Sequence, residues 1–142
     1  MAAGYPLRTM AKILVVADVA WVVNEVHAAL TDPAHELVDH RDPATAADTA
    51  LDEFVDVVVV DLQVGAMGGM AVTRSVRDAT ATAVDPGMPV VLLLDRSVDV
   101  FLARRAGAAA WVVKPFTSHE METALSRALN RRSPSPVASD QE

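Results

Sequence analysis

Short runs of apolar residues constrain the fold of this chain more than any other feature. Residues 13–17 and 55–60 are dominated by β-branched side chains, which is typical of strands buried on both faces of a sheet. Residues 89–94 and 110–113 are of the same kind, and residues 36–38 form a weaker candidate between polar flanks. We therefore expect five buried strands, because a half-exposed sheet would alternate apolar and polar residues.

Segments with helical spacing separate the predicted strands. Apolar residues recur every three or four positions over residues 19–30, and Asp18 is a candidate N-cap for that helix. An Asp-Pro pair at the start of residues 42–52 is typical of a capped first turn. A third helix is expected over residues 70–83, and residues 85–87 (DPG) form a turn ahead of the fourth strand.

The last two helices have clear end signals. The fourth is expected to end at Gly107 and to turn three apolar side chains inward, those of Val98, Phe101 and Leu102. For the fifth helix, Thr117 and Glu120 have the spacing of a capping box, and Asn130 is a candidate end. Strand and helix thus alternate five times, which predicts an α/β protein with a parallel sheet covered by helices on both faces.

Composition limits the size and the partners of the protein. With 142 residues, 51% of them hydrophobic and only 4% aromatic, we expect one domain with a core of Val, Leu and Ala. We assign residues 1–10 to an N-terminal extension, 11–130 to the domain and 131–142 to a flexible tail, with no output domain.

Charge and cysteine content exclude several classes of function. A net charge of −7 argues against direct nucleic-acid binding. The absence of cysteine excludes disulfides and thiolate metal sites, and it agrees with a cytoplasmic protein. No apolar run is long enough for a membrane span, and the first residues lack the pattern of a signal peptide.

Charged residues follow the predicted strands at one edge of the sheet. In an open parallel sheet, ligands bind beyond the carboxyl ends of the strands, where the strand order reverses. Asp18 follows the first strand, Asp61 the third, Asp95 the fourth and Lys114 the fifth. We expect Asp18, Asp61 and Lys114 to meet in one crevice, where carboxylate oxygens can hold Mg²⁺ and the lysine can balance additional negative charge.

Four stretches of the chain resemble the receiver domain of bacterial two-component response regulators. They are residues 12–18 (KILVVAD), 55–69 (VDVVVVDLQVGAMGG), 88–94 (MPVVLLL) and 106–116 (AGAAAWVVKPF). The resemblance rests on all four stretches in this order. It implies a flavodoxin-like, doubly wound sheet of five parallel strands in the order 2-1-3-4-5, with five helices.

The resemblance also implies a role for each residue at the strand ends. Asp61 matches the phosphoacceptor, which takes a phosphoryl group from a histidine kinase. Lys114 matches the lysine that meets this group, and it precedes a proline, Pro115, that is cis in the family. Asp18 and Asp61 match Mg²⁺ ligands, and Gln63 matches the residue that gives the metal its backbone carbonyl. Mg²⁺ and lysine offset the charge of the transferring group while the carboxylate attacks in line.

Two positions depart from the family pattern. Receivers carry paired acids after the first strand, but here Ala17 precedes Asp18, so we expect Mg²⁺ to bind weakly. Leu94 stands where receivers have a Ser or Thr whose hydroxyl bonds the phosphoryl group and acts as a switch. The following loop is shorter than in the family, which can bring Asp95 or Ser97 toward the site.

The remaining polar and aromatic residues have simpler interpretations. Trp111 fills the position of the family's switch aromatic, and packing on an edge strand explains it equally well. Trp21 is expected to pack or to be partly exposed. The four histidines share no helical face or ligand spacing, so we expect them on the surface: His27, His35, His40 and His119.

Two functions agree with this pattern. The first is a stand-alone phosphorelay receiver, which signals to a downstream protein, or forms a homodimer, through its fourth helix, fifth strand and fifth helix. The second is a pseudo-receiver, an interaction module that works without phosphorylation. We do not expect an enzyme, because nothing resembles a nucleophile with its base. A flavin carrier is disfavoured because the loop after the first strand lacks a Ser/Thr/Gly-rich phosphate cradle.

Overall fold

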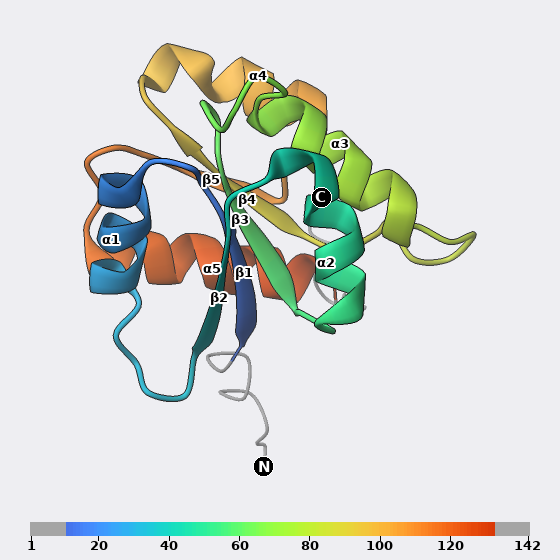
Figure 1. Cartoon of the computed structure of the whole chain (residues 1–142), viewed down its shortest axis with the longest axis horizontal. Helices are drawn as coiled ribbons and strands as arrows, with labels where there is room; N and C mark the ends of the chain where they lie inside the picture. Colours follow the sequence, from blue (N-terminus) through green and yellow to red (C-terminus); the bar gives the residue numbers. More distant parts are fainter. Residues whose placement is uncertain (1–10, 133–142) are drawn as a thin grey trace, which may run out of the picture.

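A computed structural model of the chain describes residues 11–132. Strands and helices alternate along it, as the sequence predicts (Figure 1). The strands are β1 (Lys12–Val16), β2 (Glu36–His40), β3 (Val57–Asp61), β4 (Val90–Leu94) and β5 (Ala110–Val113). The helices are α1 (Ala20–Ala29), α2 (Ala46–Asp52), α3 (Gly69–Thr80), α4 (Val100–Ala106) and α5 (Ser118–Arg132). The short 3₁₀ helices η2 (Pro43–Thr45) and η3 (Ser97–Asp99) precede α2 and α4.

The sheet is parallel throughout, and its strand order is β2-β1-β3-β4-β5. This confirms the predicted α/β class and the 2-1-3-4-5 order. Val16 pairs with Val60, and Asp61 pairs with Leu93, so β1, β3 and β4 end at the same edge. The strand order reverses between β1 and β3, which places a ligand crevice at that edge.

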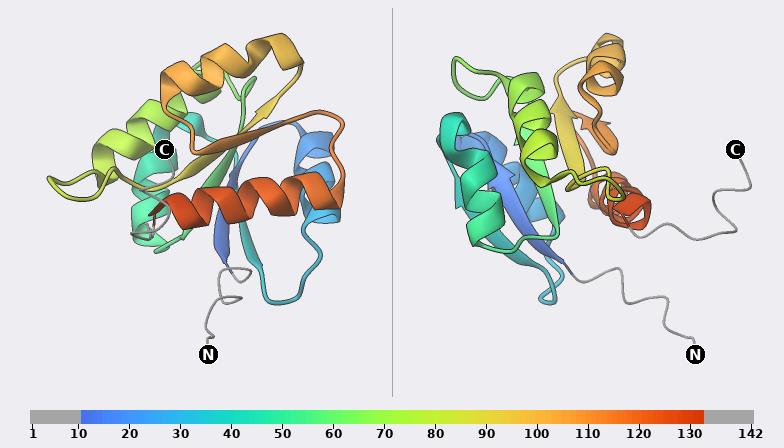
Figure 2. Two further views of the ribbon diagram at one scale, coloured as in Figure 1. Left: turned by 180° about the vertical axis from the view of Figure 1, so that it is seen from behind. Right: turned by 90° about the vertical axis from the view of Figure 1, so that its right-hand side faces the viewer.

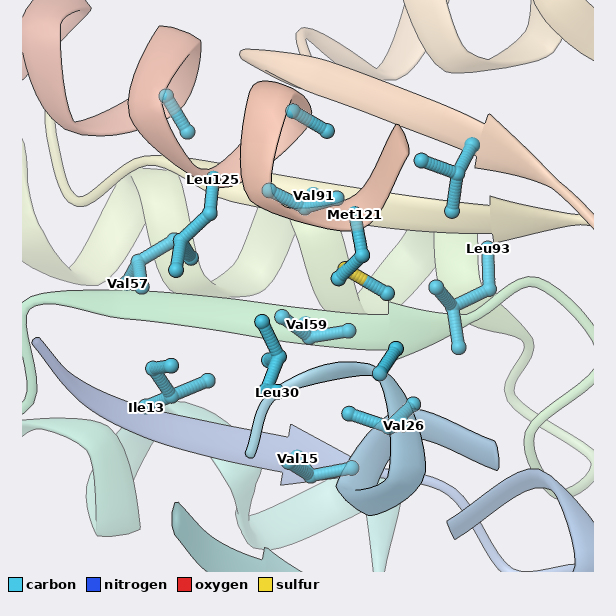
Figure 3. Packing of buried hydrophobic residues seen from close by; sticks show 14 of the residues in the cluster. Ile13, Val15, Val26, Leu30, Val57, Val59, Val91, Leu93, Met121 and Leu125 are labelled. Carbon is cyan, nitrogen blue, oxygen red and sulfur yellow. The ribbon is translucent and has the colours of Figure 1, made fainter. Parts of the chain in front are cut away.

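Helices cover both faces of the sheet (Figures 1 and 2). Because successive strand residues point to opposite faces, Ile13 and Val15 pack with α1 and α5, whereas Leu14 and Val16 pack with α2, α3 and α4. Figure 3 shows the first of these two cores, with Met121 from α5 among the strand valines. The buried residues of both cores are aliphatic or Met, as the low aromatic content predicts.

Two predicted N-terminal caps are confirmed, those at Asp42 and at Thr117. Asp42 Oδ1 accepts a hydrogen bond from the Ala44 backbone N–H at 2.9 Å and caps the 3₁₀ helix η2, which begins at Pro43 and leads into α2. Thr117 Oγ1 accepts from the Glu120 N–H at 3.0 Å, and Glu120 Oε1 accepts from the Thr117 N–H at 2.9 Å. These paired bonds form the capping box at the start of α5, where they satisfy donors that have no partner inside the helix.

Two other predicted helix ends are wrong. Asp18 does not cap α1: the N-cap residue is Val19, and no side chain caps it. The Asp18 carboxylate instead accepts a hydrogen bond from the backbone of Gly65, which lies 47 positions further along the chain. In the last helix, Asn130 is not the end of α5, which continues to Arg132. The predicted N-terminal extension, 1–10, and residues 133–142 of the predicted tail lie outside the described residues.

The predicted inward face of α4 is also wrong. Val98 and Phe101 are 63% and 55% exposed, Leu102 is half-buried, and the buried residues of α4 are Ala103 and Ala106. Short alanine side chains let this helix lie close to a sheet whose own leucines and valines already fill the core. Gly107 does end α4 as predicted, in the left-handed conformation with φ of 85°.

One histidine is buried, contrary to the prediction. The His35 side chain is fully shielded, and its Nε2 lies 3.2 Å from a carboxylate oxygen of Glu122 on α5. His27 and His40 pair with Asp39 and Thr45 instead. His35 is buried because its imidazole lies where the loop before β2 meets α5, rather than on an open face.

Within residues 11–132, no helix is long and apolar enough to cross a membrane.

Candidate functional site

Asp61 and Lys114 form an ion pair at the C-terminal edge of the sheet. Asp61 is the last residue of β3 and is 1% exposed. Lys114 follows β5, where its backbone N–H donates to the Leu94 carbonyl at 2.8 Å. This arrangement brings Lys114 Nζ to 2.7 Å from Asp61 Oδ1, so the ammonium compensates a carboxylate that water barely reaches. The peptide bond between Lys114 and Pro115 is cis, as the resemblance implies.

Asp95 provides a second carboxylate for the same lysine. It follows β4 directly, and its Oδ1 lies 3.0 Å from Lys114 Nζ. Partial burial would raise the pKa of Asp95, but hydrogen bonds from Lys114 and Gln63 outweigh it and hold that pKa below its ordinary value. Burial would lower the pKa of Lys114, but hydrogen bonds to Asp61 and Asp95 raise it above its ordinary value. One ammonium group is therefore shared between two carboxylates.

Asp18 is tied to the loop that joins β3 to α3. Its Oδ2 accepts from the Gly65 backbone N–H at 3.0 Å, and Arg41 donates to the Asp18 carbonyl at 3.4 Å. The Gln63 backbone N–H donates to Asp61 Oδ1 at 3.3 Å, so the same loop is bonded to both carboxylates. Asp61 and Lys114 are thus in direct contact. Asp18 is connected to Asp61 only indirectly, because each carboxylate accepts a hydrogen bond from the loop between β3 and α3.

The oxygen donors at this edge suit a hard cation. Carboxylates of Asp18 and Asp61 with the Gln63 carbonyl are the ligand type that Mg²⁺ prefers. Ala17 is 1% exposed and contributes no oxygen. Within residues 11–132, no group of three or more His, Cys, Asp or Glu residues is arranged to hold a metal, and Asp95 is bonded to Lys114 instead. These donors are of the chemical type that Mg²⁺ takes, with one acid fewer than the resemblance implies.

Leu94 and Gly69 are two tightly packed residues at the ends of elements that form this edge of the sheet. Leu94, at the end of β4, is fully buried in the core beneath α2, α3 and α4, so this position offers no hydroxyl to the site. Gly69 begins α3, and a Cβ there would lie 2.7 Å from the Asp61 carbonyl oxygen and 2.7 Å from Leu62 Cα. Glycine is therefore required at this point, where α3 approaches the backbone of β3.

Trp21 is a site residue that the sequence reasoning missed. It lies in the first turn of α1 and is 57% exposed, which confirms the predicted partial exposure. Its ring also lies beside Lys114, with Nζ 5.5 Å from the ring centroid. The only available signal was its position three residues after Asp18. Trp111, on β5, is partly buried, and the Arg104 guanidinium of α4 lies 5.5 Å from its ring centroid.

Comparison with known proteins identifies the family. The family model for the response regulator receiver domain matches residues 13–126. The response regulator ArlR of Staphylococcus aureus is 27% identical over 127 residues, which cover 88% of this chain and 55% of that protein. The chain therefore spans about half the length of this curated relative.

Solved structures agree with this assignment. The chemotaxis protein CheY4 of Vibrio cholerae is 26% identical with a TM-score of 0.71, over 84% of this chain and 99% of that one. NtrX from Brucella abortus is 25% identical with a TM-score of 0.75, over 94% of this chain and 30% of that one. The receiver domain of a sensor histidine kinase from Pseudomonas aeruginosa, 22% identical over 85% of this chain and 98% of that one, shares the fold with a TM-score of 0.71.

The fold and the family match define a signalling module of the two-component class. The chain belongs to the response regulator receiver domain family.

Proposed function

We propose that this receiver domain accepts a phosphoryl group on Asp61 from a histidine kinase or a phosphotransfer protein. The observation that carries the proposal is the 2.7 Å contact between Lys114 Nζ and Asp61 Oδ1 at the edge where the strand order reverses. The only buried aspartate that ends a strand of the described sheet faces a cation at the place where ligands of such sheets bind. An aspartate that only capped a strand would not require a buried lysine beside it.

The transfer is an in-line displacement at phosphorus. An oxygen of the Asp61 carboxylate forms the new O–P bond while the P–N bond of the donor phosphohistidine breaks, and the imidazole nitrogen keeps the electron pair and takes a proton from water. Lys114 offsets negative charge on the phosphoryl oxygens as they arrive. Asp61 is buried on a rigid strand, so its carboxylate is held in position for attack.

A divalent cation fits the same edge. Asp18, Asp61 and the backbone carbonyl of Gln63 would hold Mg²⁺, which supplies charge stabilisation for phosphoryl transfer. The Pseudomonas aeruginosa receiver domain noted above has a magnesium ion coordinated in its active-site cleft, which supports the same assignment here. Because Ala17 stands in place of an acid, we expect Mg²⁺ to bind weakly to this chain.

Output to a downstream protein is proposed through α4, β5 and α5. A groove of about 350 Å³ lies on this face, lined by Trp111 of β5 and by Val100, His119 and Arg127 of the two helices. The adjoining apolar residues Val98 and Phe101 are more than half exposed. This face is suited to a protein partner or to a second copy of the chain, and we propose no direct contact with nucleic acid or membrane.

Mass spectrometry tests the acceptor directly. The protein is incubated with Mg²⁺ and a small acyl phosphate, and its intact mass is measured. We expect one added phosphoryl mass, and we expect Asp61→Asn to abolish it. Asp78→Asn, on the exposed surface of α3, removes the same charge away from Lys114 and should leave the added mass unchanged.

A second function is supported by the two departures from the family pattern. Leu94 is buried where receivers have a hydroxyl, and Ala17 is buried where they have an acid. These features favour a pseudo-receiver, which binds partners without phosphorylation. Absence of the added mass in the unaltered protein, together with its appearance in a variant carrying Ala17→Asp and Leu94→Thr, would favour this second function.

A further inference from the structure

The Lys114 ammonium group is enclosed on three sides. Asp61 Oδ1 lies 2.7 Å from Nζ, Asp95 Oδ1 lies 3.0 Å from it, and the Trp21 ring centroid lies 5.5 Å from it. The Lys114 side chain is only 10% exposed. An ammonium group has three N–H donors, and two of those of Lys114 are already bonded to carboxylates.

The charge balance around Lys114 disfavours another anion. One positive charge faces two carboxylates, so this half of the site already has an excess of negative charge. A phosphoryl group on Asp61 would bring roughly one and a half to two further negative charges. Like charges within a few ångströms repel strongly where water is scarce. Asp95 and the incoming phosphoryl group therefore compete for one lysine.

We propose that Asp95 is a built-in competitor of the phosphoryl group: its carboxylate occupies the place on Lys114 that the phosphoryl oxygens need, and phosphoryl acceptance requires it to turn away. The inference rests on the proposed function. Asp95 is thus a residue that tunes the reaction of Asp61 through Lys114. It forms no bond to phosphorus itself.

The structure gives Asp95 a route out of the site. Its side chain is 37% exposed, whereas that of Asp61 is 1% exposed, so rotation of the Asp95 side chain toward water loses little burial. The backbone after Asp95 is held separately, because the Asp99 N–H donates a hydrogen bond to the Arg96 carbonyl at 3.0 Å. A side-chain rotation is therefore sufficient, and the loop itself need not move.

The first experiment measures the rate of phosphoryl acceptance. The unaltered chain and the variants Asp95→Ala and Asp95→Asn are incubated with Mg²⁺ and acetyl phosphate, and the added mass is followed with time. We expect Asp95→Ala to react about tenfold faster, with Asp95→Asn in between because its amide keeps an acceptor oxygen without the charge. Asp78→Ala is the matched control: it removes one negative charge from exposed α3 and should not change the rate.

The second experiment does not depend on covalent chemistry. In a Trp111→Phe background Trp21 is the single tryptophan, and its fluorescence is titrated with inorganic phosphate in the presence of Mg²⁺. We expect Asp95→Ala to bind phosphate about tenfold more tightly than the unaltered site, and Asp78→Ala to bind it equally.

These results separate the inference from the proposed function. Tighter phosphate binding by Asp95→Ala without any added mass would uphold the competition and reject Asp61 as an acceptor. Added mass at equal rates in the unaltered chain and in Asp95→Ala would uphold the acceptor and overturn the competition. Equal phosphate affinity of these two proteins, or the same gain in Asp78→Ala, would also overturn it.

Discussion

The indole ring of Trp21 lies over the ammonium group of Lys114, with Nζ 5.5 Å from the ring centroid. Trp21 comes from α1 and Lys114 from the end of β5, so two distant segments of the chain meet at the candidate acceptor. A cation beside an aromatic face is worth about 0.5 to 1 kcal/mol at an exposed site. The emission of Trp21 should therefore respond to any anion that changes the surroundings of Lys114.

This contact leads to opposite predictions for the two tryptophans. A phosphoryl mimic with Mg²⁺ should change the emission of Trp21, measured in Trp111→Phe. It should barely change that of Trp111, measured in Trp21→Phe, because Leu94 provides no hydroxyl to link the phosphoryl group to β5. Leu94→Thr combined with Ala17→Asp should make Trp111 responsive. A large Trp111 response in the otherwise unaltered chain would contradict this account.

Magnesium should bind at millimolar concentration or more weakly. The site has carboxylates from Asp18 and Asp61 only, and Asp95 is held by Lys114. Isothermal calorimetry should show that Ala17→Asp tightens binding about tenfold, equivalent to about 1.4 kcal/mol. Ala20→Asp, at the start of α1, is a control for general negative charge and should have a smaller effect. Micromolar affinity of the unaltered chain would show that another group completes the metal site.

Replacing Lys114 should destabilise the fold through Asp61. Lys114→Met removes the cation from a carboxylate that is 1% exposed, which should lower the free energy of unfolding by about 3 kcal/mol in urea. Adding Asp61→Asn to Lys114→Met should recover most of that loss, because no buried charge then remains without its partner and the Asp95 side chain, which is 37% exposed, can be solvated by water. If the two substitutions were simply additive, the ion pair would contribute nothing to stability.

The same pair predicts a loss of stability in alkali. The pKa of Lys114 is raised above its ordinary 10.5 by its two carboxylates. Its contribution to stability is therefore complete below pH 10.5 and is lost as the pH rises through the higher folded-state pKa. The difference in unfolding free energy between the unaltered chain and Lys114→Met should be constant near neutral pH and should shrink in strong alkali. A difference that grew with pH would reverse the sign of this argument.

Gly107 should be sensitive to substitution for a conformational reason. Its φ is 85°, and the Arg77 guanidinium occupies the space that a Cβ would need. Gly107→Ala should therefore lower the unfolding free energy by about 1 to 2 kcal/mol, measured by thermal or urea unfolding. Gly107→Asn should cost less, since asparagine tolerates the left-handed conformation. Equal losses for both variants would indicate that the Arg77 contact dominates.

The strands were predictable because burial on both faces leaves a direct mark on the sequence. A parallel strand such as Val57–Asp61 must be apolar at nearly every position, whereas a helix that covers one face of a sheet keeps a polar side toward water. The helix faces were harder to predict. Val98 and Phe101 have helical spacing, yet the sheet contacts Ala103 and Ala106, because helical periodicity does not tell which stripe of a short helix lies closest to the sheet.

The candidate site was predictable where a residue follows a strand directly, and less so elsewhere. Asp61 and Lys114 follow from the strand ends and the topology. Asp95 also follows a strand, but its bond to Lys114 depends on a side-chain rotamer that no sequence pattern specifies. Trp21 and the buried His35 depend on how a helix or a loop packs against a distant segment, and local pattern carries no such information.

Ala17 and Leu94 continue the apolar core to the edge where the charged residues stand, with 1% and 0% exposure. Functional sites commonly lower the stability of the fold that carries them, because burying polar groups close together costs free energy. Apolar residues at positions 17 and 94 avoid this cost. Because Ala17 leaves Asp18 without an adjacent acid, no bound cation is needed to offset a pair of acids there, and we expect removal of Mg²⁺ to leave the stability of the folded domain nearly unchanged.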